Sequence, residues 1–200
     1  DDPHIARLKI TYDGEMFDNH QMNASDLSLI VSSVEKIFLK INEIVNKNFV
    51  KVDVKVDANF VKGSFGIDFI IITQLVNTTI ESLNSEVVEA IINAVGLAGI
   101  LIGLIKLIIH KNRKKIKLKM KESYYEKIKY DKNSKITSKI IKKSNEVELD
   151  ADDFYEDIVS IINKNNADKI TMETDDDKEI FTKEDIDKNN FDDSSDDEKN

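Results

Sequence analysis

The sequence predicts a mixed α+β protein in which two small α+β modules flank one long hydrophobic helix. Three observations lead to this prediction. Apolar and polar residues alternate in several short segments, as they do in half-buried strands. One segment near the N-terminus instead repeats apolar residues at helical spacing. A third segment, residues 87–109, is almost entirely apolar and holds three of the six glycines in the chain.

The predicted N-terminal module, residues 1–73, begins with a strand and a helix. Apolar and polar side chains alternate from Arg7 to Tyr12, which indicates a strand, and Asp13-Gly14 ends it as a turn. Asn23 followed by Asp26 has the spacing of a capping box at a helix start. The helix should bury one apolar stripe, made of Leu27, Ile30, Val31, Val34, Ile37, Phe38, Ile41, Ile44 and Val45.

A hairpin follows this helix. Val50–Val56 alternates valine with charged residues and has the clearest strand pattern in the chain. Lys62–Ser64 predicts a turn, and Phe65–Ile72 predicts the second strand of the hairpin. A short helix is expected between Leu75 and Leu83.

The predicted hydrophobic segment, residues 74–110, contains the long helix over residues 87–109, with Ser85 as its cap. No polar side chain occurs from Ala94 to Ile105. A helix this apolar is either inserted in a membrane or buried on all sides.

The glycines of this helix predict a close contact. Gly99 and Gly103 form a G-x-x-x-G pattern, and Gly96 lies on nearly the same face. Such a face lets two helices approach backbone to backbone, so these three residues are the candidate helix-packing site and predict a homo-oligomer. The alternative is that another element of the same chain packs closely there.

The predicted C-terminal module, residues 111–184, contains short strands and one helix that Asp150 caps. An acidic tail, residues 185–200, is expected to be disordered. The expected strands continue from Ile116, Leu118 and Met120 and then cover Lys127–Tyr130, Ile136–Ile141, Glu146–Leu149, Ile170–Glu173 and Glu179–Thr182.

Charge is distributed unevenly along the chain. Residues 106–143 carry 15 basic and 3 acidic groups, whereas residues 144–200 carry 6 basic and 21 acidic groups. These regions either neutralise each other or meet separate partners. A basic flank beside an apolar helix favours an anionic membrane surface over nucleic acid, which stays a possible partner. The candidate residues for binding that surface are Lys111, Arg113, Lys114 and Lys115.

The sequence contains no recognised catalytic motif, so it predicts a protein that is not an enzyme. Cysteine is absent, and His4, His20 and His110 lie in three separate contexts. Nucleophile elbows and phosphate-binding loops do not occur. The acidic runs have no glycine at the position that a calcium loop requires, so we expect no metal and no cofactor.

Six short motifs are distributed along the chain: Phe17-Asp-x-His20-x-Met22, Asp26-Leu27, Val50–Val56, Lys62-Gly-Ser-Phe-x-Ile-Asp68, Gly103-Leu-Ile-Lys106 and Thr182-Lys-Glu-Asp185. With these motifs, the layout of the chain resembles a family of uncharacterised proteins from bacteria, prophages and other mobile elements, which have a glycine-rich hydrophobic helix. That family has no established activity, so the resemblance implies an architecture and a mobile-element context.

Two functions follow as expectations. The first is a non-enzymatic mobile-element protein that self-associates through its hydrophobic helix and attaches to the inner face of the cell membrane, as a membrane-acting defence or exclusion effector. The second is a soluble phage-type accessory module that engages a host protein, a phage protein or nucleic acid. No secretory signal is evident, and the lack of cysteine fits a cytoplasmic location. Whether residues 87–109 span the membrane, lie on it or are buried in an oligomer stays open.

Overall fold

The computed structural model describes residues 3–47, 49–57, 64–76, 88–111, 115–119, 125–130, 136–140, 146–162 and 166–188. Within these ranges the chain folds into helices and antiparallel sheets, so the predicted mixed α+β class is confirmed. For residues 88–91, 111, 115–119, 125–130, 136–140 and 146–147 the description covers the backbone alone.

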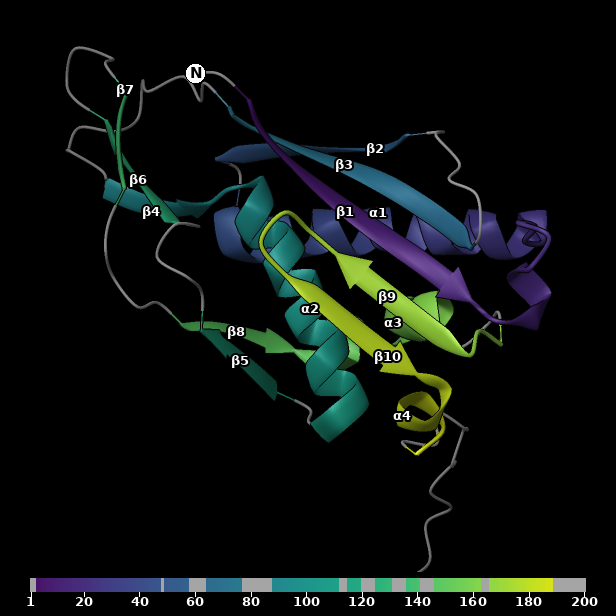
Figure 1. Cartoon of the computed structure of the whole chain (residues 1–200). Coiled ribbons are helices and arrows are strands. Elements are labelled where there is room, and N and C mark those ends of the chain that lie inside the picture. The colour runs from purple at the N-terminus through teal and green to yellow at the C-terminus, as the bar shows by residue number, and fades with distance from the viewer. Residues whose placement is uncertain are drawn as a thin grey trace, which may run out of the picture.

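A five-stranded antiparallel sheet forms the centre of the molecule (Figure 1). Its strand order is β10-β9-β1-β3-β2. The strands are β1 (His4–Asp13), β2 (Val50–Asp57), β3 (Phe65–Leu75), β9 (Lys169–Glu173) and β10 (Lys178–Thr182). The strands expected at these places are confirmed, as are the antiparallel hairpins β2–β3 and β9–β10.

The predicted arrangement of two modules flanking a helix is not confirmed. Residues 9–13 of β1 pair with residues 169–173 of β9, so both ends of the chain share one sheet. Figure 1 shows the purple and yellow-green strands side by side. The physical reason is that the β2–β3 hairpin pairs with only one edge of β1, and β9 satisfies backbone groups on the other edge.

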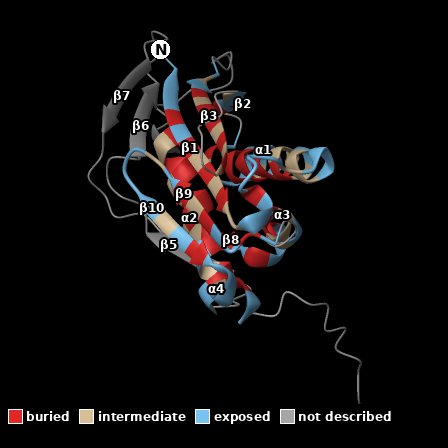
Figure 2. Cartoon of the chain, turned by 45° about the vertical axis from the view of Figure 1, so that its right-hand side comes forward, coloured by how far each residue is buried: buried red, intermediate tan, exposed pale blue. Residues whose placement is uncertain are grey.

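Three helices cover one face of this sheet (Figures 1 and 2). None of the helices in the described residues covers the other face, which is called the open face below. They are α1 (Ala24–Asn46), α2 (Ala94–Lys111) and α3 (Tyr155–Ile162). Helix α2 packs against β1 and β3, while α1 packs against β2, α2 and α3. The Tyr12 hydroxyl on the covered face donates to the Ile161 carbonyl at 2.9 Å and so joins β1 to α3.

The core lies between the sheet and these helices. Alternate residues of β1 and β3 are buried and stand opposite one another, as Leu8 does to Phe69 and Ile10 to Ile67. The α1 stripe is largely confirmed, except that Ile44 is 41% exposed. On α1 the buried residues are Ile30, Ser33, Val34, Ile37, Phe38, Ile41, Asn42 and Asn46.

The predicted long hydrophobic helix over residues 87–109 is wrong in its first part. Residues Val88–Ile92 form strand β4, and α2 begins only at Ala94. The cause is Asn93, whose Oδ1 accepts from the Gly96 N–H at 3.1 Å and caps the helix. Ser85, the expected cap, lies outside the described residues.

A cluster of buried amides fixes the start of α2. Asn46, near the end of α1, donates from Nδ2 to the Ile92 carbonyl at 2.8 Å and accepts from the Ile92 N–H at 2.7 Å. It also donates to Asn42 Oδ1 at 2.9 Å, and Thr73 Oγ1 accepts from the Ala94 N–H at 3.1 Å. Buried backbone groups of the β4–α2 junction are thereby satisfied by α1 and β3.

Two smaller sheets complete the described strands. One has the order β4-β6-β7, and the other pairs β5 with β8. Their strands are β5 (Lys115–Lys119), β6 (Tyr125–Tyr130), β7 (Ile136–Ile140) and β8 (Glu146–Asp150). The strands expected here are confirmed within one or two residues.

The helix caps differ in part from those predicted. Asp150 caps the short 3-10 helix η4 (Ala151–Asp153), whereas the expected helix, α3, begins only at Tyr155. Asn23 precedes α1 without a side-chain cap bond, and its Nδ2 donates to Asp26 Oδ2 at 3.2 Å. A capping box occurs at Thr182 in front of α4 (Lys183–Asp187).

The expected start of the disordered tail at residue 185 is corrected by the same helix. Ile186 of α4 is only 4% exposed and belongs to the core. Its burial ties the segment after β10 to the rest of the domain. Residues 189–200 lie outside the described residues.

Replacing Asn46 with leucine should destabilise the fold by about 2–6 kcal/mol. The change leaves the buried N–H and carbonyl of Ile92 without partners, at about 1–3 kcal/mol each. Urea denaturation followed by circular dichroism measures the loss. Glu43→Leu, on the exposed face of the same helix, is the matched control. A loss below about 0.5 kcal/mol for Asn46→Leu would show that the junction does not depend on this side chain.

Candidate functional site

The partly exposed residues of α2 form one line along the helix. Val95, Gly99, Gly103 and Leu107 recur every four residues and are only partly buried. Residues four apart lie on one face of a helix, so these four make a continuous narrow strip, called here the glycine line. Two glycines at its centre leave the helix backbone without side-chain cover.

The rest of α2 is used by the core of the same chain. Its buried residues pack with β1, β3 and α1. None of the helices in the described ranges has the length and apolar character that a membrane crossing needs. The fully or nearly fully buried residues are Ala94, Leu97, Ala98, Ile100, Leu101, Ile102, Leu104, Ile105, Ile108 and Ile109.

Charged groups flank the C-terminal end of the glycine line. Lys106 and His110 are exposed, one on either side of Leu107 along the chain. Lys106 Nζ makes an ion pair with Glu179 of β10. This contact fixes α2 to the edge of the sheet beside the glycine line.

The nearby carboxyl of Asp185 is held in its ionised form. Asp185 Oδ2 accepts from the Thr182 hydroxyl at 2.6 Å and from the Thr182 N–H at 3.0 Å. These two bonds, the hydroxyl first, lower the pKa of Asp185 below its ordinary 3.8, and the positive charges of His110 and Lys188 add to the effect. The end of α2 thus faces a fixed negative charge.

The predicted site residues separate into three groups. Gly99 and Gly103 lie on the glycine line, but Gly96 is buried in the first turn of α2. Lys111 ends α2 and Lys115 begins β5, with only their backbones described. Arg113 and Lys114 lie outside the described residues.

Part of the basic region lies opposite acidic positions along the β5–β8 ladder. Positions directly opposite on an antiparallel ladder share a face and are close enough to interact. Every lysine of β5 faces an acidic position of β8, which favours neutralisation within the chain over a separate partner for these lysines. The facing positions are Lys115 and Asp150, Lys117 and Glu148, and Lys119 and Glu146.

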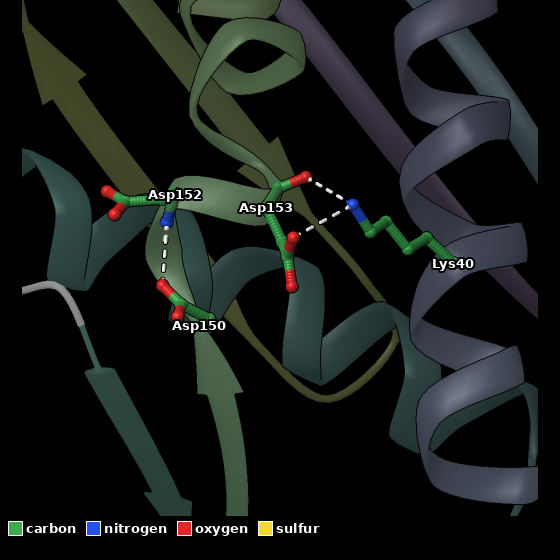
Figure 3. A network of polar contacts seen from close by, with 4 residues as sticks. All are labelled: Lys40, Asp150, Asp152 and Asp153. Carbon is green, nitrogen blue, oxygen red and sulfur yellow. Dashed lines mark hydrogen bonds and ion pairs between the residues drawn. The ribbon is translucent and has the colours of Figure 1, made fainter.

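A polar contact that the sequence did not reveal joins α1 to η4 (Figure 3). Lys40 Nζ donates to the Asp153 carbonyl at 2.9 Å and lies 3.3 Å from Asp153 Oδ1. The same ammonium lies 5.5 Å from the centre of the Phe154 ring. Asp150 Oδ1 accepts from the Asp152 N–H at 3.1 Å. In the part of the chain described here, however, no cluster of acidic or histidine side chains could hold a metal ion.

A shallow hollow of about 210 Å³ lies beside the start of α1. Its only carboxyl is Asp26, which already accepts from Asn23. The lining offers amides and thioethers but no base next to a nucleophile. The residues around the hollow are Met16, Phe17, Gln21, Met22, Asn23 and Asp26.

No model of a protein family matches this chain, and neither a curated protein nor a solved structure does. The resemblance to a mobile-element family therefore stays a prediction from the quoted motifs.

Asp185 should titrate below pH 3.8 in the folded protein. Because its pKa is lowered on folding, its stabilising effect is complete above the unfolded pKa and is lost as pH falls through the folded pKa. Carboxyl NMR resonances measure this titration directly. Thr182→Val should raise the pKa toward 3.8, whereas Thr171→Val on β9 should leave it unchanged. A wild-type Asp185 that titrates at or above 3.8 would contradict the capping interaction.

Proposed function

We propose that this protein is a non-enzymatic, self-associating protein of a prophage or other mobile element, attached to the inner face of the cell membrane. The observation that carries the proposal is the glycine line of α2. Self-association would place the same line of a second copy against it, with the two helix backbones in close approach.

The burial of α2 limits how this contact forms. The other residues of the helix already pack in the core, so the association uses the folded domain and leaves α2 in place. Glycine in a helix costs roughly 1 kcal/mol relative to alanine. Two glycines at half-buried positions are therefore best explained by a close neighbour on that face.

Attachment to the membrane would depend on the basic segment after α2. The lysines of β5 stand opposite acidic residues of β8, whereas residues 111–114 precede that ladder. Positive charge in this segment is attracted to anionic lipid by about 1 kcal/mol per residue. A peripheral, charge-driven attachment follows, and a membrane-acting defence or exclusion effector is the corresponding biological role.

A soluble accessory module that binds a host protein, a phage protein or nucleic acid is the second candidate. The observation that favours it is the open face of the sheet, which presents alternating charged side chains such as Arg7, Lys9 and Lys55 to solvent. Cell fractionation separates the candidates. Release from membranes by high salt supports peripheral attachment, and a protein found only in the soluble fraction supports the accessory module.

Introducing isoleucine at Gly99 and Gly103 should abolish contact between copies through α2. The added side chains would keep the two backbones apart, since each would stand where the partner helix must approach. Chemical cross-linking through lysines near α2 measures the contact. Alanine at the same positions is the matched control and should retain it with a higher melting temperature. Unchanged cross-linking in the isoleucine variant would remove the glycine line from the proposal.

Changing Lys111, Arg113 and Lys114 to glutamine should weaken binding to anionic vesicles about 150-fold, whereas Lys115, which lies opposite Asp150 on the ladder, should contribute little. Three charges at about 1 kcal/mol each give this factor. Vesicle co-sedimentation measures it, and neutral vesicles should show no change. Lys117→Gln with Lys119→Gln, on the paired ladder, is the control and should have little effect. Strong DNA binding that falls in the same variant, with no vesicle binding, would favour the accessory module.

A further inference from the structure

Strand β2 forms one edge of the five-stranded sheet, and its register shows which backbone groups face outward. The Phe49 carbonyl accepts from the Val76 N–H at 3.0 Å, so Phe49 directs its backbone groups toward β3. In an antiparallel ladder this direction alternates, and the odd-numbered residues of β2 therefore bond to β3. The valines point their N–H and carbonyl groups to the open edge. Consistently, the Val50 carbonyl accepts from Asn42 Nδ2 at 2.8 Å rather than from β3.

Among the described residues no strand pairs with this outer edge of β2. Val52, Val54 and Val56 therefore present a row of backbone donors and acceptors there. An edge of this length built from β-branched residues is a template for another strand. Val56 is 45% exposed although it lies on the helix-covered face of the sheet.

The charges of β2 are self-complementary. Its sequence is Val-Lys-Val-Asp-Val-Lys-Val-Asp, from Val50 to Asp57. When two such strands run antiparallel about Val54, Lys51 faces Asp57 of the other strand and Asp53 faces Lys55. The lysines and aspartates share the open face of the sheet, and the valines share the covered face.

The helix beside this edge adds an exposed apolar residue. Leu39 of α1 is 46% exposed and lies three residues before Asn42, whose side chain reaches β2. Residues three apart share a helix face, so Leu39 is on the β2 side of α1. A second copy at this edge would cover Leu39 and Val56 together.

We propose that two copies of this chain pair antiparallel through β2, with Val54 facing Val54, to form one continuous sheet. Facing valines exchange backbone hydrogen bonds across the new ladder, and oppositely charged side chains pair on the open face. The helices of both copies lie on the same side of the extended sheet. This interface is isologous, because each copy contributes the same residues.

Other registers form fewer ion pairs or oppose like charges. Centring the pair on Val52 or Val56 leaves two pairs of opposite charge in place of four. Centring the pair on Asp53 would place Asp53 against Asp53 and Lys51 against Lys55, and centring it on Lys55 would likewise oppose like charges. Two ion pairs already involve these residues, Arg7–Asp57 at 3.6 Å and Lys51–Asp53 at 3.4 Å, and their groups are partly or largely exposed to solvent. Such pairs are weak and exchange readily for cross-strand partners.

The interface is on a different element from the glycine line of α2, so it is independent of the proposed function. A charge-swap experiment tests it with the full chain. One variant carries Lys51→Asp and Lys55→Asp, which makes the edge acidic, and the other carries Asp53→Lys and Asp57→Lys, which makes it basic. Each variant alone should form no dimer through β2. An equimolar mixture of the two should form a dimer that contains one copy of each.

Analytical ultracentrifugation and native mass spectrometry measure these species. The full set is made in the Gly99→Ile, Gly103→Ile background, so that contact through α2 does not contribute. In that background the chain with an unchanged β2 should be a dimer, and each single charge variant should raise the dissociation constant at least 100-fold. Lys178→Asp with Lys183→Asp changes the net charge equally at the opposite edge of the sheet, on and after β10, and should leave the dimer intact.

Val54→Pro tests the ladder itself. It removes an outward N–H and no bond to β3, so an edge strand tolerates it. Circular dichroism establishes that it folds, and the dimer should be lost. A monomeric glycine-variant chain with unchanged β2, or a dimer that survives both charge variants, overturns the proposal. Neither result bears on the contact through the glycine line, which the cross-linking experiment tests separately.

Discussion

Covering α2 is the constraint on which the described fold depends. The described side chains of α2 are buried, apart from the glycine line and the charged Lys106 and His110. No single element is wide enough to enclose these buried side chains. The sheet supplies one side, α1 supplies another, and β9 with β10 widens the sheet. The C-terminal part of the chain completes this cover, because β5 and α4 contact α2 and the Lys106–Glu179 ion pair connects β10 to it.

The polar cluster at the start of α2 determines where that apolar helix begins. The Asn46 side-chain amide bonds both the N–H and the carbonyl of Ile92, as a neighbouring strand would. It can do so because it offers the same donor and acceptor as a peptide group. Asn93 then turns the chain from β4 into the helix. These amides fix position and direction, whereas the apolar contacts around them provide most of the stabilisation.

The local elements could be predicted from the sequence because their patterns are local. Alternation at Val50–Val56 and the helical stripe of α1 depend only on which face is buried. The junction at Asn93 was missed because apolar character continues across it, although an asparagine before an apolar run is itself a cap signal. The pairing of β1 with β9 and of β5 with β8 has no local signal. Of the candidate site, Gly99 and Gly103 were identified together, while the partly exposed line and the Lys40–Asp153 contact required the fold.

The position of β9 has a consequence for the nascent chain. Tyr12 bonds to a carbonyl 149 residues later, and β9 follows that position. At a synthesis rate of about 5–20 residues per second, some 8–30 s separate the emergence of the two partners from the ribosome. During this interval β1 has an unpaired edge and α2 has left the tunnel without its full cover. An exposed strand edge and apolar surface of this kind are what make a partly synthesised chain prone to aggregation, so the late position of β9 exposes the nascent chain to that hazard.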